Sequence, residues 1–171
     1  MIKKLLPILM LTLLFTFELH AFTFSSTTGF AIPVGSWANQ HSSSPFISIG
    51  SVLIRKNFAS LGISLDLFSF SGKLNENYHL QIVSPGTCIK FYPLFFANNH
   101  ILIVKETLSY VIMQRKLHDS FEKGKDFALL SAIGAEFKFG ENWFISSCIG
   151  DNHYAGGMDM FIFSFGIEFR K

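Results

Sequence analysis

Charged residues stand at alternate positions in several apolar segments of this chain, and their spacing suggests where their chemistry lies. Glu136 and Lys138 alternate with phenylalanines, and Glu168 lies between Ile167 and Phe169. Period-two alternation is typical of β-strands, whose successive side chains point to opposite faces. Charges on an enclosed face must be paired. The predicted members of one paired network are Asp66, Lys90, Glu136, Lys138 and Glu168, with Arg55 or Lys105 as further candidates.

The last segment shows most clearly which element positions such charges. From Phe161 to Phe169, one parity is wholly apolar and rich in phenylalanine. The other parity holds Ser164, Gly166 and Glu168, with Ile162 as the exception. An apolar face this large is too aromatic for a small soluble sheet. The pattern predicts a strand between lipid and a narrow polar lumen.

Composition bounds the class of protein. The chain has 171 residues, enough for one domain, and a net charge of +2 that gives no reason to expect a nucleic-acid partner. Hydrophobic residues make up 49%, including 21 phenylalanines, yet no apolar run after the first twenty residues approaches the ~18 needed for a membrane helix. A closed barrel is the other way to cross a bilayer, because it pairs every backbone group.

The N-terminus has the features of a secretory signal. Lys3 and Lys4 precede an apolar run from Leu5 to Phe17, and Ala21 offers a small residue before a cut. We predict a signal peptide over residues 1–21 and a barrel domain over residues 22–171. An uncleaved anchor helix is the alternative, but the run is shorter than a typical span.

The mature chain divides into eight candidate strands joined by polar or turn-forming residues. The predicted strands are Phe22–Pro33, Phe46–Lys56, Phe58–Phe70, Tyr78–Tyr92, His100–Met113, Asp126–Phe139, Trp143–Gly150 and Met158–Lys171. The alternation slips at Gly50-Ser51, where we expect a bulge. Lys105 and Glu106 are adjacent, so one of them must face lipid unless another bulge intervenes. A lipid-facing charge near mid-bilayer costs about 2–4 kcal/mol for lysine and less for glutamate.

The connections carry a further signal. Longer loops are predicted after the odd-numbered strands, including 34–45, 71–77, 114–125 and 151–157, and shorter turns after the even-numbered ones. Outer-membrane barrels have short periplasmic turns and longer extracellular loops. We therefore predict an all-β fold, an eight-stranded antiparallel up-and-down transmembrane β-barrel. A soluble sandwich or lipocalin-like barrel is the alternative, but it would leave phenylalanines facing water.

In a barrel of this size the interior is just wide enough for side chains to fill it. The predicted network is therefore interpreted as a salt-bridged plug, with a narrow ion path or a catalytic carboxylate pair as alternatives. Cys88 and Cys148 also point inward, but their strands lie nearly across the barrel, and a disulfide needs Cα atoms within roughly 7 Å. Two buried free thiols are favoured over a bridge. No spacing of cysteine and histidine resembles a metal site, and no cofactor is expected.

The chain resembles the small eight-stranded outer-membrane barrels of the OmpA/OmpX/opacity type. The resemblance rests on the signal peptide, the hairpin Gly-Ala-Glu-Phe-Lys-Phe-Gly-Glu-Asn-Trp at 134–143, and the end Gly166-Ile167-Glu168-Phe169. It covers the mature chain and implies an address in the outer membrane of a Gram-negative-type bacterium. It also implies contact with outer-membrane lipid and lipopolysaccharide, and recognition of the C-terminal strand by the barrel assembly machinery.

The histidines at 41, 79, 118 and 153 are expected in solvated loops. The stretch around His153 is similar in placement to the catalytic His-x-Ser of the lipid A deacylases, which are also eight-stranded barrels. Ala155 occupies the serine position and cannot be a nucleophile. The sequence therefore predicts a non-enzymatic barrel with a structural or surface-interaction role through its loops, whose ligand is unknown. A lipid A-modifying enzyme and a narrow channel or port are the alternatives.

Overall fold

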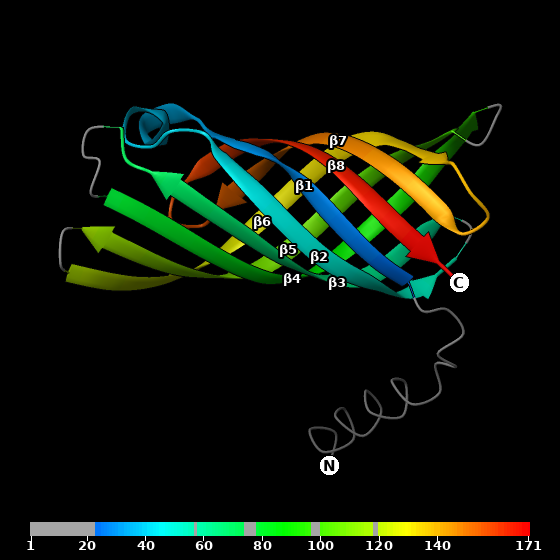
Figure 1. The fold of residues 1–171 in the computed structure, drawn as a ribbon, viewed down its shortest axis with the longest axis horizontal. Helices are drawn as coiled ribbons and strands as arrows, with labels where there is room; N and C mark the ends of the chain where they lie inside the picture. The colour runs from blue at the N-terminus through cyan, green and yellow to red at the C-terminus, as the bar shows by residue number, and fades with distance from the viewer. Residues whose placement is uncertain (1–22, 57, 74–77, 97–99, 118–119) are drawn as a thin grey trace, which may run out of the picture.

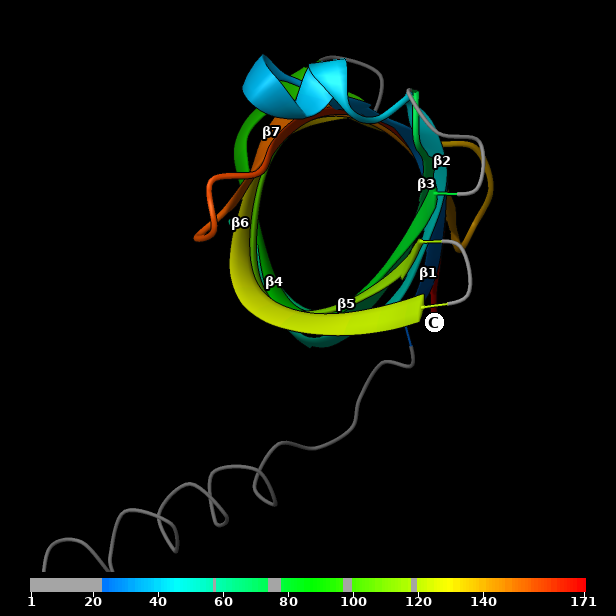
Figure 2. The same cartoon turned by 90° about the vertical axis from the view of Figure 1, so that its left-hand side faces the viewer.

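Eight β-strands form a closed antiparallel barrel in the computed structural model, which describes residues 23–56, 58–73, 78–96, 100–117 and 120–171 (Figure 1). The strands are β1 (Thr23–Pro33), β2 (Ser44–Arg55), β3 (Ala59–Ser71), β4 (Tyr78–Phe96), β5 (His100–Leu117), β6 (Ser120–Lys138), β7 (Trp143–Tyr154) and β8 (Asp159–Arg170). Each strand pairs with the next along the chain, and β8 pairs with β1 to close the ring seen end-on in Figure 2. The up-and-down barrel is confirmed. The predicted signal peptide and first mature residue lie outside the described residues.

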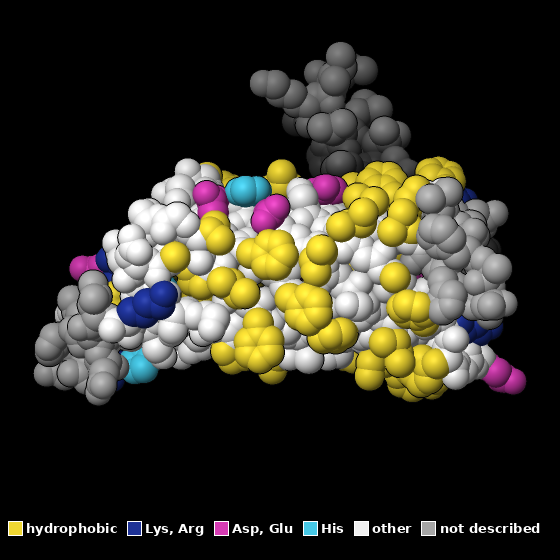
Figure 3. Space-filling model, turned by 90° about the horizontal axis from the view of Figure 1, so that it is seen from above, with side chains coloured by type: hydrophobic (Ala, Val, Ile, Leu, Met, Phe, Trp, Pro, Cys, Tyr) yellow, Lys and Arg dark blue, Asp and Glu magenta, His cyan; other side chains and the backbone are white. Residues whose placement is uncertain are grey.

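The two faces of the wall follow from the alternation along each strand. Phe161, Phe163 and Phe165 of β8 point outward and are 37–50% exposed, whereas Glu168 is 3% exposed in the lumen. Apolar side chains spread over the middle of the face shown in Figure 3, and a few acidic side chains and a histidine lie along its upper edge. The inward position Gly134 has no room for a side chain, because an added Cβ would collide with the carbonyl oxygen of Ser147. Among the described residues, no helix is both long and apolar enough to cross a membrane.

The strands run further than expected at one end of the barrel. Residues 114–117 and 120–125, predicted as parts of a charged loop, instead extend β5 and β6, which pair in register from His100 to Leu117. Residues 151–154, also predicted as loop, belong to β7. The long-and-short rhythm of connections is therefore wrong after β5 and β7. Backbone pairing does not depend on apolar side chains, so polar segments continue as a sheet.

Two local expectations are also corrected. The register shift in β2 lies between Val52 and Ile54, a few residues after the predicted bulge at Gly50-Ser51. β4 continues past Pro93 to Phe96, with a second register shift between Phe91 and Leu94. Proline has no N–H to donate to the ladder, which explains an irregularity at this point.

The barrel is taller on one side. β4, β5 and β6 have 19, 18 and 19 residues, against 11 for β1 and 12 for β7 and β8. The far ends of β4, β5 and β6 project at the left of Figure 1. At the same end the loop after β1 contains the short helix η1 (Gly35–Asn39), and the backbone of Lys73 donates to the carbonyl of Gln40 in that loop.

Candidate functional site in the barrel lumen

An ionic cluster fills the lumen at the end where β2, β4, β6 and β8 finish. It consists of Arg55, Lys90, Glu136, Glu168 and Arg170, supplied by β2, β4, β6 and β8. Lys90 Nζ donates to Glu168 Oε2 at 2.5 Å, and Arg170 Nε donates to Glu168 Oε1 at 2.6 Å. Arg55 Nη2 donates to the same Oε1 at 3.2 Å. One carboxylate thus gathers three cations.

Glu136 is the most enclosed member of the ionic cluster, with 0% of its surface exposed. Arg170 Nη2 lies 2.5 Å from Glu136 Oε1, close enough for an ion pair but without the angles of a hydrogen bond. The Arg170 guanidinium also stacks over the Phe144 ring at 3.5 Å. Arg55 donates to the Tyr92 hydroxyl as well. Because a buried charge must be paired, Arg170 is the group that permits two carboxylates here.

The structure brings together Lys90, Glu136 and Glu168 from the predicted network, with Arg55 as an additional candidate. Lys138 does not join them: it lies exposed at the end of β6 and makes no salt bridge among the described residues. Asp66 lies elsewhere in the lumen. Sequence reasoning missed Arg170, although it shares parity with Ser164, Gly166 and Glu168 and so follows the same inward face.

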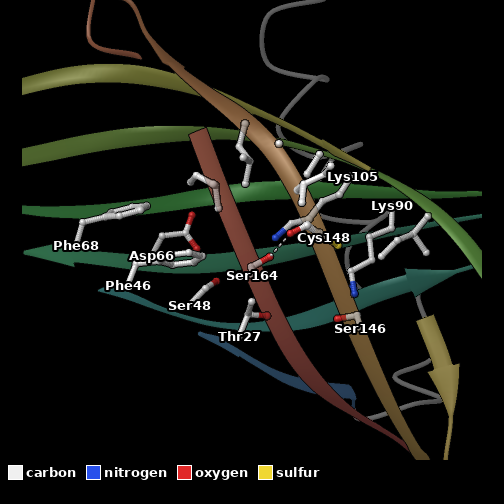
Figure 4. A pocket seen from close by; sticks show the side chains of 16 residues that line it. Thr27, Phe46, Ser48, Asp66, Phe68, Lys90, Lys105, Ser146, Cys148 and Ser164 are labelled. Carbon is white, nitrogen blue, oxygen red and sulfur yellow. Dashed lines mark hydrogen bonds between the residues drawn. The ribbon is translucent and has the colours of Figure 1, made fainter. Parts of the chain in front are cut away.

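Asp66 lines a small cavity between the ionic cluster and the opposite end of the barrel. Its other lining residues include Ser48, Lys90, Lys105 and Cys148 (Figure 4). The volume of this cavity, taken as the space that the centre of a water molecule can reach, is only about 30 Å³, which is room for one or two waters. Asp66 is buried and makes no hydrogen bond or salt bridge with any described residue. The expected single network is therefore corrected to an ionic cluster and a separate carboxylate facing this cavity.

An apolar cap closes the lumen at the opposite end, which bears the loop with η1. Its largest buried aromatic side chains are Phe46, Phe68 and Phe70, and the ring planes of Phe68 and Phe70 are 12° apart. The remaining buried members are Ala31, Leu80, Ile82, Val111, Ala128, Tyr154, Met160 and Ile162. The expectation that aromatic side chains point out and small or ionic ones point in is wrong for this part of the lumen.

The loop after β1 folds over the apolar cap. Trp37 meets Phe70 edge-on at 5.5 Å, and His41 lies 4.4 Å from Trp37 and 5.1 Å from Tyr78 between ring centroids. His41 is 2% exposed, so its predicted solvated position is wrong. Burial, and then the nearby Arg115, lower the pKa of His41 below its ordinary value of 6.5. The loop places a neutral aromatic ring on the cap.

Two further expectations concern the adjacent charges Lys105 and Glu106 and the two cysteines. Lys105 points into the cavity, and Glu106 points outward without a bulge, accepting a hydrogen bond from Ser131 at 2.7 Å. Cys88 and Cys148 are both buried and both free thiols. No group of three metal-ligating side chains occurs among the described residues.

His153 lies on the outer face of β7, away from the lumen. Its Nδ1 is 2.9 Å from Asp159 Oδ1 on β8, directly across the strand pair. Ala155 follows β7, and no hydroxyl or thiol of a described residue is hydrogen-bonded to this imidazole. The pair could hold or move a proton, but it has no nucleophile beside it.

No protein-family model matches the sequence, and no curated protein matches it significantly. Three solved structures share the architecture. The Neisserial surface protein NspA aligns at 16% identity and TM-score 0.66, covering 87% of this chain and 97% of that chain. The N-terminal barrel domain of Pseudomonas aeruginosa OprF has 13% identity, TM-score 0.60 and coverage of 88% and 97%. Ail, the attachment invasion locus protein of Yersinia pestis, aligns at 10% identity and TM-score 0.59, covering 88% of this chain and 99% of that chain.

These likenesses define the class of fold. All three neighbours are small eight-stranded outer-membrane barrels, and their strands pair as this chain's do. The protein therefore has the fold of the small outer-membrane β-barrels, as the resemblance in its sequence predicted. At these identities the comparison speaks for the architecture and not for the activity of any one neighbour.

Proposed function

We propose that this protein is a closed, non-enzymatic barrel of the bacterial outer membrane that acts through the surface it presents beyond the bilayer. The outward phenylalanines of β8 suit hydrocarbon, and the ionised groups of the ionic cluster lie on the opposite side of the wall. The outer-membrane neighbours support the same address. Outer-membrane lipid and lipopolysaccharide would then be its direct surroundings.

The tall wall formed by β4, β5 and β6 carries the proposal of a surface role. Strands of about 9–11 residues suffice to cross the outer membrane, and these strands are far longer. Their excess lies at the end that also bears the loop with η1 (Figure 1). A paired hairpin projecting from the membrane holds a fixed shape for a partner, unlike a loop.

Surface labelling tests this role with a matched pair of lysines. Lys123 lies on the projecting hairpin and Lys138 at the opposite end of the same strand, both exposed. A membrane-impermeant amine reagent applied to intact cells should modify Lys123, and should modify Lys138 only after the outer membrane is permeabilised. The protein should also migrate differently on gels before and after boiling. Its recovery from the soluble periplasmic fraction without such a shift would contradict the proposal.

The lumen argues for a barrel that does not conduct. The ionic cluster fills one end, the apolar cap fills the other, and the cavity between them is small. Planar bilayers containing the purified protein should show no discrete conductance steps. Reproducible steps would support the channel alternative instead.

The lipid A-modifying alternative rests on the His153–Asp159 pair alone. Replacing His153 with Ala should leave the mass spectrum of lipid A unchanged, since no nucleophile accompanies the histidine. A loss of one modified lipid A species would favour the enzyme.

We also propose that the barrel assembly machinery recognises β8, so Phe169→Ala should slow assembly of the barrel.

A further inference from the structure

A row of basic side chains covers the outward face of the projecting hairpin. Lys116 lies on β5, and Lys123 and Lys125 lie on β6 at positions of the same outward parity as exposed Phe127. The three are called the lysine ladder here. His79 of β4 lies in register with Lys116 and is exposed too. Because β5 and β6 pair without a register shift, these cations belong to adjoining rows of one surface.

The lysine ladder has no anionic partner among the described residues. The acidic side chains of the same stretch of β6, Glu122 and Asp126, alternate with the lysines and so belong to the other face. Glu122 pairs with Arg115 at 3.5 Å. Asp126 accepts hydrogen bonds from the backbone N–H groups of Phe127 and Gly156. Counting the described residues alone, the outward face is left with positive charge that no anion offsets.

Next to the lysine ladder the outer wall is hollowed into a groove. The volume of the groove that the centre of a water molecule can reach is about 500 Å³, which is within the range of small-molecule sites. Its outward side chains are Thr28, Pro45, Ile47, Leu67, Ser69, Gln81 and Val83. Where β8 presents phenylalanines, this part of the wall presents shorter groups such as Thr28 and Ser69, which leaves the hollow.

The groove and the lysine ladder are continuous. Gln81, at the groove's upper end, pairs in register with Gln114, and Gln114 pairs with Lys123. Apolar Ile47, Leu67 and Val83 therefore lead along the wall toward ammonium groups that have no anionic partner among the described residues, one of which, that of Lys116, lies 5.7 Å from the centre of the Phe121 ring. Ser69 and Gln81 make no side-chain hydrogen bond with any described residue, so their polar atoms can serve a ligand.

We infer that the groove and the lysine ladder form one binding site for a phosphorylated glycolipid of the outer leaflet. An acyl chain would lie in the groove and the phosphate groups on the lysine ladder. This inference rests on the proposed location in the outer membrane. Lysine suits phosphate as a compact point charge, and basic clusters beside a membrane bind anionic headgroups. A soluble polyanion would use the charges but would leave the apolar groove empty.

The charge half of the site is tested by neutralising the lysine ladder. The folded protein, purified from membranes, is titrated with bis-phosphorylated lipid A in micelles of a neutral detergent. The triple variant Lys116→Gln, Lys123→Gln, Lys125→Gln should bind about 100-fold more weakly, since each lysine near an anionic headgroup contributes about fivefold. Lys138→Gln, at the far end of β6, should bind like the parent. A change of less than threefold in the triple variant would overturn the inference.

The groove half is tested by filling it. Ser69→Trp places a large side chain in the groove, and Ser26→Trp makes the same change at an exposed outward position of β1 outside it. Ser69→Trp should weaken lipid A binding about tenfold and Ser26→Trp should not. Equal affinities for the two variants would contradict an acyl chain in the groove. Heat-modifiable migration verifies that each variant is folded.

The outcomes separate this site from the proposed function. Loss of lipid A binding with unchanged fractionation and unchanged labelling of Lys138 leaves the outer-membrane role intact and supports the site. If the triple variant loses binding of a soluble sulfated polysaccharide but keeps lipid A, the lysine ladder serves another class of partner and the inference fails. Recovery of the protein from the periplasm would instead remove the proposed function.

Discussion

The two ends of the lumen are closed by opposite chemistries within one narrow barrel. At one end Glu136, Glu168 and Arg170 meet in a dense ionic cluster. At the other, Phe70 and its apolar neighbours pack beneath Trp37. Removal of one member of the ionic cluster leaves a buried charge without its partner, whereas removal of a member of the apolar cap leaves a cavity. Substitutions in the ionic cluster are therefore expected to lower the stability of the barrel more than substitutions in the apolar cap.

The largest effect is expected from Arg170→Ala. It removes the cation beside Glu136 and one of those beside Glu168, and should lower the free energy of unfolding by about 3–5 kcal/mol. Urea titration of the protein in lipid vesicles, read by heat-modifiable migration, measures this. Lys138→Ala is the matched control and should change stability by less than about 0.5 kcal/mol. Adding Glu136→Gln to Arg170→Ala should recover part of the lost stability. Equal stability of Arg170→Ala and Lys138→Ala would show that the ionic cluster does not depend on Arg170.

The apolar cap should respond less. Phe70 is fully buried, and Phe70→Ala should lower the free energy of unfolding by about 3 kcal/mol, the lower end for such changes, because the overlying loop can settle into the gap. Phe163→Ala, on the outward face, should cost about 1 kcal/mol, since lipid chains can fill the space. The same urea titration applies. A larger loss at Phe163 than at Phe70 would mean that the interior aromatic side chains do not close the lumen.

A third comparison sets a carboxylate on the outer wall of the barrel against one on the projecting hairpin. Glu106 points outward near the middle of β5, and within the described part of the chain Ser131 is its one hydrogen-bond donor. Glu106→Leu should raise the free energy of unfolding by about 1–2 kcal/mol, because lipid-facing carboxylates are unfavourable at that depth. Glu122→Leu, on the projecting hairpin, is the control and should be nearly neutral. Destabilisation by Glu106→Leu would indicate that this carboxylate has a partner in the membrane.

The smallest effect concerns pH at the apolar cap. The folded protein favours neutral His41, whose pKa lies below 6.5, while the unfolded chain takes up a proton near 6.5. The contribution of His41 is therefore complete above pH 6.5 and is lost as the pH falls through that value. Trp37 fluorescence between pH 8 and pH 5 should report the loosening of the loop. His41→Phe should remove the pH dependence, and an unchanged titration in that variant would assign it to another group.

The alternation of side chains made the barrel predictable, because one parity of β8 is apolar and the other holds Gly166 and Glu168. Strand ends were harder to predict. The segment 114–125 is rich in charge and predicts a loop, yet residues 114–117 and 120–125 continue the β5–β6 pairing through backbone hydrogen bonds that no side-chain pattern records. Arg170 was missed for a related reason: its position after the last aromatic looked terminal, although its parity pointed inward.

By itself the sequence determined that the chain forms an up-and-down barrel and that, in a strand such as β8, phenylalanines face outward and the carboxylate inward, because a period of two separates the two faces of a strand. Only the tertiary structure decided which inward groups meet. Closure of β8 onto β1 and the stagger between strands bring Arg170 to Glu136 and separate Asp66 from the ionic cluster. The same stagger gathers Phe46, Phe68 and Phe70 beneath Trp37. Contacts across a lumen depend on strand height as well as parity, and height is set by pairing rather than by any single segment.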